Sequence, residues 1–336
     1  MLVASAPGKL VALGEYAVLE GAPAVVLAVD RYVSTTIDAI GGDSCELTTF
    51  APERVRCRFA PGQPSGSALI DLVVARGGPS RVWRATVDSR PFFEGPTKLG
   101  LGSSAAVLCA FAGAWAAFAA AADGRVQPSP SLAALIELHR AFQGGRGSGL
   151  DVAASLTGGA ITFSLTPAGT PQIGSVRLPN GVGFAGIFAG RSASTPELIA
   201  HYRAWRRERP LQAAAMLARL TMLAEAGSAA ARGGEAAAFV RAFADYGRGL
   251  AALGEAMGAE VVTAEHRQVG DEADRFGVAY KVSGAGGGDL GLACAADPDA
   301  LAAFAKSIGD RGFRVIKVSL AERGLTVAPR DVGAKP

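Results

Sequence analysis

The segment that most constrains this chain is a glycine- and serine-rich turn, residues 98–106 (KLGLGSSAA), which runs directly into a long apolar stretch. The N-terminus of a helix presents backbone N–H groups without partners and the positive end of the helix dipole. Glycines allow that backbone to approach a polyanion closely, so the turn fits a phosphate-binding loop. The alternative is an ordinary glycine-rich turn capped by serine, because short motifs of this kind often occur by chance. The turn alone leaves both interpretations open.

The apolar stretch after the turn, residues 105–122, contains no charged or strongly polar side chain and is long enough to raise the question of a membrane span. Most of it is alanine, which is weakly hydrophobic, and a phosphate-binding turn would have no purpose at a lipid boundary. We therefore expect a buried core helix over 104–122. Its large apolar residues at helical spacing are Val107, Leu108, Phe111, Trp115 and Phe118.

Two further segments accompany the turn: residues 6–24 (APGKLVALGEYAVLEGAPA) and residues 281–289 (KVSGAGGGD). In order and spacing, the three segments resemble the three signature motifs of the GHMP kinases, which include galactokinases, homoserine kinases, mevalonate kinases and phosphomevalonate kinases. The resemblance covers nearly the whole chain. Three ordered motifs are far more specific than any one of them.

Within that family, the details resemble the phosphomevalonate kinase branch. The first motif carries Tyr16 where mevalonate kinases usually carry histidine, and residues 147–155 (GSGLDVAAS), 286–289 and 190–195 (GRSAST) are similar to segments of that branch. The decarboxylases of the superfamily have a different first motif, so they resemble this chain less. The resemblance implies phosphorylation of 5-phosphomevalonate to 5-diphosphomevalonate in the mevalonate pathway. The first alternative is a kinase that acts on mevalonate or another small molecule. The second is a non-catalytic protein of the same fold that binds a ligand as a sensor.

Phosphoryl transfer depends on alignment and charge neutralisation, so a kinase needs a phosphate cradle, a magnesium ligand and a cation. The turn supplies the cradle for ATP, and Ser104, with Ser103 as the second choice, would place a hydroxyl near Mg²⁺. Ser104 could instead only cap the helix, a role that is compatible with metal contact. The predicted nucleotide-binding residues are Lys98, Gly100, Leu101, Gly102, Ser103, Ser104 and Ala105.

Lys9 and Asp151 are the predicted catalytic residues. A lysine beside Gly8 at the start of a buried strand carries a desolvation cost unless an anion is present, which favours a role next to the transferred phosphoryl group. Asp151 could serve as an ordinary carboxylate in the first turn of a helix. The resemblance pairs it with Lys9. It would act as a general base for an alcohol acceptor, but would orient Lys9 or bind the metal for a phosphate acceptor, which is already ionised.

An acceptor phosphate would require further cations, for which Arg146, Arg191 and Lys98 are candidates, although each could also be simply solvated. In the third motif, the resemblance places Ser283 and Asp289 near the ligands, and the structural alternative is a tight loop between strands. The predicted substrate-binding residues are Glu15, Tyr16, Arg146, Ser148, Arg191, Ser283, Gly284, Ala285, Gly286 and Asp289.

The order of predicted strands and helices favours an α+β protein. Strands are expected at 24–29, 32–37, 81–87, 160–163, 183–188 and 313–318, and helices at 104–122, 131–143, 151–157, 298–310 and across 196–256. The resemblance implies an N-terminal domain like ribosomal protein S5 domain 2 and a C-terminal ferredoxin-like domain. A proline- and glycine-rich stretch at 166–171 suggests a boundary between residues 1–168 and 169–336.

Composition excludes several other classes. A net charge of +3 over 336 residues is too small for nucleic-acid or membrane binding, so the expected partners are ATP and a small molecule, with the chain a monomer or homodimer. Four cysteines without CxxC spacing, and a first basic residue only at Lys9, favour the cytoplasm. No Walker A or clear dinucleotide-binding pattern is present. The histidines, His139, His201 and His266, are widely separated, which disfavours a histidine metal site or a hydrolase triad.

Overall fold

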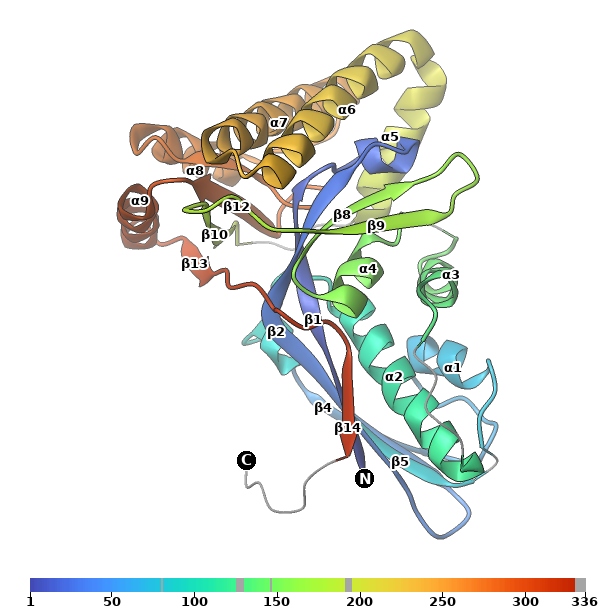
Figure 1. The fold of residues 1–336 in the computed structure, drawn as a ribbon. Coiled ribbons are helices and arrows are strands. Elements are labelled where there is room, and N and C mark those ends of the chain that lie inside the picture. The colour runs from blue at the N-terminus through green and yellow to red at the C-terminus, as the bar shows by residue number, and fades with distance from the viewer. Residues whose placement is uncertain (80, 125–129, 146, 191–194, 330–336) are drawn as a thin grey trace.

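The computed structural model describes residues 1–79, 81–124, 130–145, 147–190 and 195–329 (Figure 1). Its strands are β1 (Leu2–Leu13), β2 (Ala24–Ala39), β3 (Cys45–Phe50), β4 (Arg54–Phe59), β5 (Trp83–Asp88), β6 (Phe93–Glu94), β7 (Thr97–Lys98), β8 (Ala160–Leu165), β9 (Pro171–Val176), β10 (Gly183–Phe188), β11 (Ala279–Val282), β12 (Leu290–Ala295), β13 (Arg314–Lys317) and β14 (Thr326–Pro329). Its α-helices are α1 (Ala68–Val74), α2 (Ser103–Asp123), α3 (Leu132–Phe142), α4 (Leu150–Thr157), α5 (Thr195–Glu208), α6 (Pro210–Gly233), α7 (Ala236–Ala256), α8 (Ala264–Arg275) and α9 (Pro298–Asp310). Two short 3₁₀ helices are η1 (Ala17–Glu20) and η2 (Arg90–Phe92).

The larger sheet of the described chain has eight strands. Its main path runs β14-β1-β2-β5-β3-β4, and β8 pairs with both β2 and β9. Helices α2 and α4 pack on β1 and β2, and α1 and α3 form a further layer on those helices, as Figure 1 shows. The main core lies between this sheet and α2, and its fully buried members include Leu10, Leu27, Phe92 and Phe111.

The strand β2 corrects the expectation of two strands at 24–29 and 32–37, because it is one continuous strand of 16 residues. The ladder between β1 and β2 shifts register between Pro7 and Gly8, and this bulge skips Asp30 and Arg31 of β2. Those two charged residues interrupt the apolar pattern without ending the strand. The bulge lies next to Lys9, so Lys9 is in the middle of β1 and does not begin it. Bulges commonly re-aim side chains beside active sites.

The smaller sheet has the strand order β11-β12-β10-β13, with all neighbouring strands antiparallel. In chain order, a strand is followed by helices, two strands, a helix and a last strand, which is the βαββαβ arrangement of ferredoxin-like folds. Helix α9 packs on β10, β12 and β13, and α8 packs on β11. The predicted helical region at 196–256 consists of α5, α6 and α7, of which α6 and α7 lie side by side (Figure 1). The mixed α/β fold is therefore as predicted.

The stretch at 166–171, where the sequence suggests a domain boundary, forms the turn of a hairpin. Strands β8 and β9 on either side of it pair with each other as part of the larger sheet. Strand β14, near the end of the chain, also returns to that sheet and pairs with β1. A division at 168/169 would therefore cut through a hairpin of the larger sheet. The two-domain organisation itself remains a prediction.

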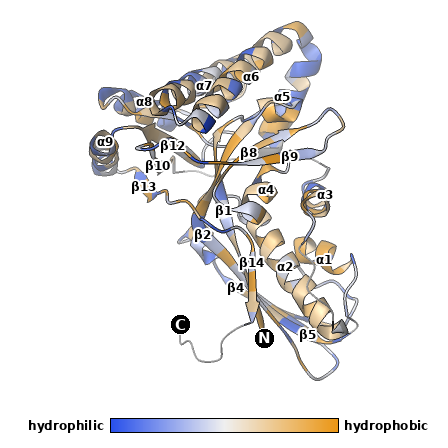
Figure 2. Cartoon of the chain, viewed as in Figure 1, coloured by the Kyte–Doolittle hydropathy of each residue, from blue (hydrophilic) through white to orange (hydrophobic). Residues whose placement is uncertain are grey.

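Helix α2 is the predicted core helix. The stretch Ser103–Ala122 has a mean hydropathy of 1.9, high enough for a membrane span, but 72% of it is buried inside the molecule. Figure 2 shows hydrophobic colouring along most of α2, which lies between the strands of the larger sheet and helices α1 and α3. The apolar character of this helix is explained by its position in the core.

Candidate active site

The glycine–serine turn leads into α2 with both of its glycines in the left-handed backbone region. Gly100 has φ +70° and Gly102 has φ +75°, conformations that side chains with a Cβ rarely adopt. Gly102 is the N-cap residue of α2, and no side-chain hydrogen bond caps the helix. The interpretation of Ser104 as a capping residue is therefore wrong. The first N–H groups of α2 are left for another partner, and an anion suits them.

Lys9 runs alongside this turn. Its backbone N–H donates a hydrogen bond to the carbonyl oxygen of Leu101 at 2.8 Å. A Cβ placed on Gly102 would lie 3.0 Å from Cγ and 3.1 Å from Cε of Lys9. The lysine stem therefore passes directly over Gly102, and the absence of a side chain there gives it room. The first and second motifs meet at this point.

The third motif reaches the same turn through Asp289. A Cβ placed on Gly100 would lie 2.9 Å from the Cβ of Asp289 and 3.2 Å from its Oδ2. The carbonyl oxygen of Asp289 accepts a hydrogen bond from the N–H of Ala189 at 2.9 Å. All three motifs thus converge on the glycine turn, as their resemblance to the family's motifs leads one to expect. The predicted nucleotide residue Lys98 is exposed on β7, just before the turn.

The hydroxyl of Ser104 is engaged by a residue that the sequence analysis set aside. Oγ of Ser104 lies 3.0 Å from Nε2 of His139, and Nδ1 of that histidine lies 3.7 Å from Oδ2 of Asp151. The wide spacing of the histidines along the chain gives no sign of this contact. The three side chains lie in one row because α2, α3 and α4 pack together. The 3.7 Å separation is too long for a hydrogen bond, so the row is looser than a hydrolase triad.

Asp151 is positioned by the loop that precedes α4. Arg140 of α3 donates hydrogen bonds from Nε to the carbonyl oxygen of Gly147 at 3.0 Å and from Nη2 to that of Ser148 at 3.1 Å. The side chain of Asp151 is 20% exposed, and its Oδ1 accepts a hydrogen bond from the N–H of Val152 at 3.0 Å. The carboxylate is therefore held in place yet accessible. The predicted cations Arg146 and Arg191 lie outside the described residues.

The remaining substrate-binding candidates of the first and third motifs hold the two motifs together. The hydroxyl of Tyr16 donates to the carbonyl oxygen of Ala285 at 2.6 Å, and Oγ of Ser283 lies 3.0 Å from the N–H and 3.1 Å from the carbonyl oxygen of Val11. Burial, with a smaller contribution from the Glu15 charge, raises the pKa of Tyr16. We call this contact surface the seam; its residues are Val11, Glu15, Tyr16, Lys281, Ser283 and Ala285.

A buried ion pair between Lys281 and Glu15 lies at the centre of the seam. The two side chains are 0% and 2% exposed, and Nζ of Lys281 also donates to the carbonyl oxygens of Val282 at 2.8 Å and Val11 at 3.3 Å. Burial lowers the pKa of Lys281, and the Glu15 charge opposes that shift. Oε1 of Glu15 additionally accepts a weak hydrogen bond from the N–H of Gly284 at 3.4 Å. Oε2 of Glu15 is buried and has no hydrogen-bond partner among the described residues.

Gly286 completes the third motif and is packed tightly, since a Cβ there would lie 2.3 Å from the carbonyl oxygen of Val261. A second unforeseen histidine holds this loop from the other side: Nε2 of His266 lies 2.8 Å from the carbonyl oxygen of Gly288. The residues of this motif are therefore fixed on both sides by protein contacts. Direct substrate contact by Ser283, Gly284, Ala285 and Gly286 remains a prediction.

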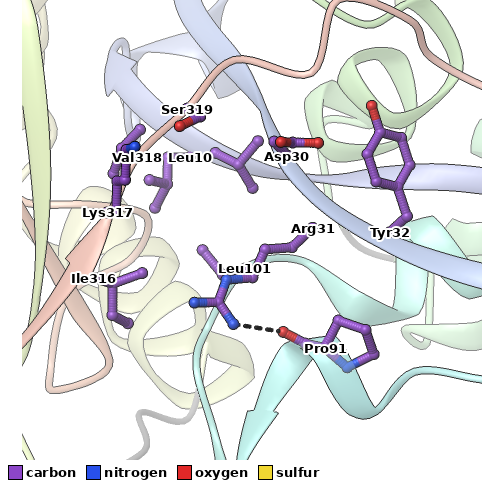
Figure 3. Close-up of a pocket in the computed structure, with 11 residues that line it drawn as sticks. Leu10, Asp30, Arg31, Tyr32, Pro91, Leu101, Ile316, Lys317, Val318 and Ser319 are labelled. Carbon is purple, nitrogen blue, oxygen red and sulfur yellow. Dashed lines mark hydrogen bonds between the residues drawn. The ribbon is translucent and has the colours of Figure 1, made fainter.

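A pocket of about 520 Å³ lies next to the site (Figure 3). The predicted nucleotide-binding residue Leu101 lines it, as does Leu10, the neighbour of Lys9, but Lys9, Ser104 and Asp151 do not. Nη1 of Arg31 donates a hydrogen bond across the pocket to the carbonyl oxygen of Pro91 at 3.2 Å. The other lining residues are Val29, Asp30, Tyr32, Ile316, Lys317, Val318 and Ser319. The pocket therefore touches the glycine turn through Leu101, and Lys9, Ser104 and Asp151 lie beside it.

Comparison with known proteins agrees with this arrangement. The model of the GHMP kinases N-terminal domain matches residues 83–159, which include the glycine turn, His139 and Asp151. The chain is 29% identical to a phosphomevalonate kinase from Streptomyces sp. (strain CL190), over 87% of this chain and 89% of that protein. It is 30% identical to a mevalonate kinase from Methanothermobacter thermautotrophicus, over 47% of this chain and 48% of that protein.

A crystal structure of Streptococcus pneumoniae phosphomevalonate kinase in complex with phosphomevalonate and AMPPNP has the same fold. It superposes with a TM-score of 0.78 at 19% identity, over 95% of this chain and 100% of that one. The fold, the three converging motifs and the relative that matches over most of both chains agree with one another. Residues 83–159 carry a GHMP kinases N-terminal domain, and over most of its length the chain is similar to phosphomevalonate kinase, as expected of an ATP-dependent phosphotransferase of that kind.

Proposed function

We propose that the protein transfers the γ-phosphoryl group of ATP to 5-phosphomevalonate, with Mg²⁺ as cofactor, in the mevalonate pathway of the cytoplasm. The observation that carries this proposal is the convergence of Lys9, Asp289 and the Ser104–His139–Asp151 row on the uncapped N-terminus of α2. The choice of acceptor is supported by the phosphomevalonate kinase relative, which matches over most of both chains.

Each part of the proposed site has a defined task. The open N–H groups of α2 and the glycine turn bind the nucleotide phosphates. The ammonium of Lys9, whose stem lies along Gly102, neutralises charge on the transferred group. Among the described residues no cluster of three or more histidine, cysteine or acidic side chains is placed to hold a metal by itself.

Mg²⁺ nevertheless fits the site, because it prefers oxygen ligands and usually shares its coordination with substrate phosphates and water. Oγ of Ser104 lies at the uncapped start of α2, and the carboxylate of Asp151 lies at the start of α4 on the other side of His139, so both are oxygens of the kind that Mg²⁺ prefers. When bound, Mg²⁺ would reduce the repulsion between the two polyanionic substrates.

The nature of the acceptor decides what Asp151 must do. The second pKa of a phosphate is about 6, so an acceptor phosphate is already largely ionised at neutral pH and needs no general base. Asp151 then acts by orienting Lys9 or the metal. The buried Oε2 of Glu15, which lacks a partner in the described part of the chain, could accept a hydrogen bond from a hydroxyl of the acceptor.

The test is a coupled ADP-release assay with mevalonate, 5-phosphomevalonate, homoserine and galactose, run in parallel on the wild type and on Asp151→Asn. We expect turnover with 5-phosphomevalonate and none with galactose. The Asp151→Asn defect should stay constant between about pH 7 and 9, because raising the pH cannot replace lost orientation.

Turnover of mevalonate without turnover of 5-phosphomevalonate would overturn the proposal and place the chain with its mevalonate kinase relative. Binding of nucleotide without turnover of any acceptor would favour a non-catalytic sensor. The assay therefore shows separately whether the protein is a kinase and which acceptor it phosphorylates.

A further inference from the structure

His139 is buried between the two residues that the proposed site depends on most. Its side chain is 2% exposed, on the last turns of α3. Nε2 lies 3.0 Å from Oγ of Ser104 at the start of α2, and Nδ1 lies 3.7 Å from Oδ2 of Asp151 at the start of α4. One imidazole therefore bridges the N-terminal turns of the two helices that carry the predicted metal ligand and the predicted catalytic carboxylate.

The imidazole cannot turn freely in this position. Its ring stacks on that of Phe142, with centroids 6.5 Å apart and planes 22° apart. The next residue, Arg140, is fixed by its hydrogen bonds to the loop before α4. Nε2 therefore stays directed at Ser104 and Nδ1 at Asp151. Residues 139–142 of α3 hold both this ring and the loop before α4.

The surroundings favour one tautomer of the neutral imidazole. A proton on Nδ1 faces the carboxylate of Asp151, and an unprotonated Nε2 then accepts the hydroxyl proton of Ser104. The hydroxyl hydrogen is directed toward His139, and this leaves the lone pairs of Oγ free to face a cation at the helix terminus. Without the histidine, the hydroxyl would rotate among several directions.

We infer that His139 is a positioning residue for phosphoryl transfer, which orients the Ser104 hydroxyl toward Mg²⁺·ATP. The inference rests on the proposed function, because it assumes that Ser104 and Asp151 act on Mg²⁺ and the phosphates. An ordinary buried histidine would instead contribute only to the packing of α3.

The experiment measures kcat, KM and the calorimetric affinity for Mg²⁺·ATP in His139→Ala, His139→Gln and His139→Asn. Loss of a residue that orients a metal ligand typically costs 10- to 100-fold, so His139→Ala should lower kcat by about that factor. It should also weaken Mg²⁺·ATP binding, while KM for the acceptor changes little. The amide oxygen of His139→Gln can accept the Ser104 proton and should restore part of kcat, whereas His139→Asn is too short to reach Ser104 and should restore less.

Two controls separate positioning from packing. Leu138→Ala removes a neighbouring buried side chain of the same helix, so it should lower the melting temperature and leave kcat close to that of the wild type. In a double-mutant cycle with Ser104→Ala, His139→Ala should cause less than about a threefold further loss, because its effect passes through Ser104.

The inference is overturned by a wild-type kcat in His139→Ala, by fully additive losses in the cycle, or by an equal loss of kcat in Leu138→Ala. If the wild type binds Mg²⁺·ATP but phosphorylates none of the acceptors, the proposed function fails while the inference stays open to test. In that case the binding affinities of the same variants decide whether His139 orients Ser104.

Discussion

Lys9 is a residue whose local environment predicts the effect of its replacement. Its stem lies along Gly102, so Lys9→Met keeps the apolar contact with the turn and removes the charge. Because we assign that charge to the transferred phosphoryl group, kcat should fall by ~10²-fold or more, with a smaller change in the affinity for ATP. Steady-state kinetics together with calorimetric ATP binding would check this.

The matched control for Lys9→Met is Lys306→Met on α9. That lysine is 79% exposed and pairs with Asp310 far from the glycine turn, so its loss should leave both measurements unchanged. A Lys9→Met protein with normal kcat and only weakened ATP binding would contradict the assignment.

At the same scale, the sequence predicts the residues of the site unevenly. Gly100, Gly102 and Lys9 are recognisable, because their neighbours in the chain form a motif with a known physical purpose. His139 is not, because its partner Ser104 is 35 positions away and nothing in the sequence shows that α2 and α3 pack side by side. Four of the seam residues, Glu15, Tyr16, Ser283 and Ala285, are predicted to contact substrate, and the structure gives them protein partners as well.

At the scale of elements, Glu46 joins three strands of the larger sheet. It lies on β3 with a side chain that is 3% exposed, and its carboxylate contacts Arg56 of β4 at 2.9 Å and Arg84 of β5 at 2.7 Å. Arg58 of β4 contributes a third contact at 2.9 Å. Hydrogen bonds from Arg84 and Arg56 lower the pKa of Glu46 from its ordinary value of 4.5 to about 2.

This shift predicts a pH-dependent stability. Because the pKa is lower in the folded state, the contribution of Glu46 is fully present above about pH 4.5 and is lost as the pH falls toward 2. The difference in unfolding free energy between the wild type and Glu46→Gln should therefore shrink as urea unfolding is repeated from pH 6 down to pH 3. Glu137→Gln, at a side chain that is 65% exposed, should have little effect at any pH. If the difference in unfolding free energy between the wild type and Glu46→Gln were the same at pH 6 and pH 3, the ion pairs of Glu46 with the three arginines would not contribute this pH-dependent stability.

The elements that the sequence predicts correctly are those whose own residues form a recognisable apolar pattern. Helix α2, strand β10 and helix α9 have long or regular apolar patterns, and they lie where the sequence places them. Strand β14 was not predicted, because it is four residues long and is defined by its pairing with β1. The stretch at 166–171 is predicted to be a domain boundary but forms a hairpin turn. Proline and glycine mark both kinds of segment, and the strand pairing that distinguishes them is not visible in the local sequence.

For the whole molecule, the seam couples the two sheets through the buried pair of Lys281 and Glu15. Removing one member of a buried ion pair leaves an uncompensated charge and typically costs about 3–5 kcal/mol. Lys281→Met should therefore lower the unfolding free energy by about that amount, as measured by urea unfolding. The double variant Glu15→Gln/Lys281→Met should lose less than the sum of the two single variants, because no buried charge is left without a partner.

The double variant also tests whether the two sheets unfold together. Loss of this ion pair at the centre of the seam should split a single unfolding transition into two when fluorescence and circular dichroism are compared. Single-variant losses that simply add up would mean that the pair contributes nothing as a pair.

Strand β14 gives the larger sheet a particular order of assembly. It covers the edge of β1 that faces away from β2, although it follows β1 in the chain only after more than 300 residues. At a synthesis rate of roughly 5–20 residues per second, this edge of β1 stays uncovered for tens of seconds before β14 is made. An open strand edge is a template for pairing with another chain, and neighbouring polysomal chains expose the same edge. The interval between the synthesis of β1 and that of β14 is therefore the period in which this edge of the sheet is open to pairing with another chain.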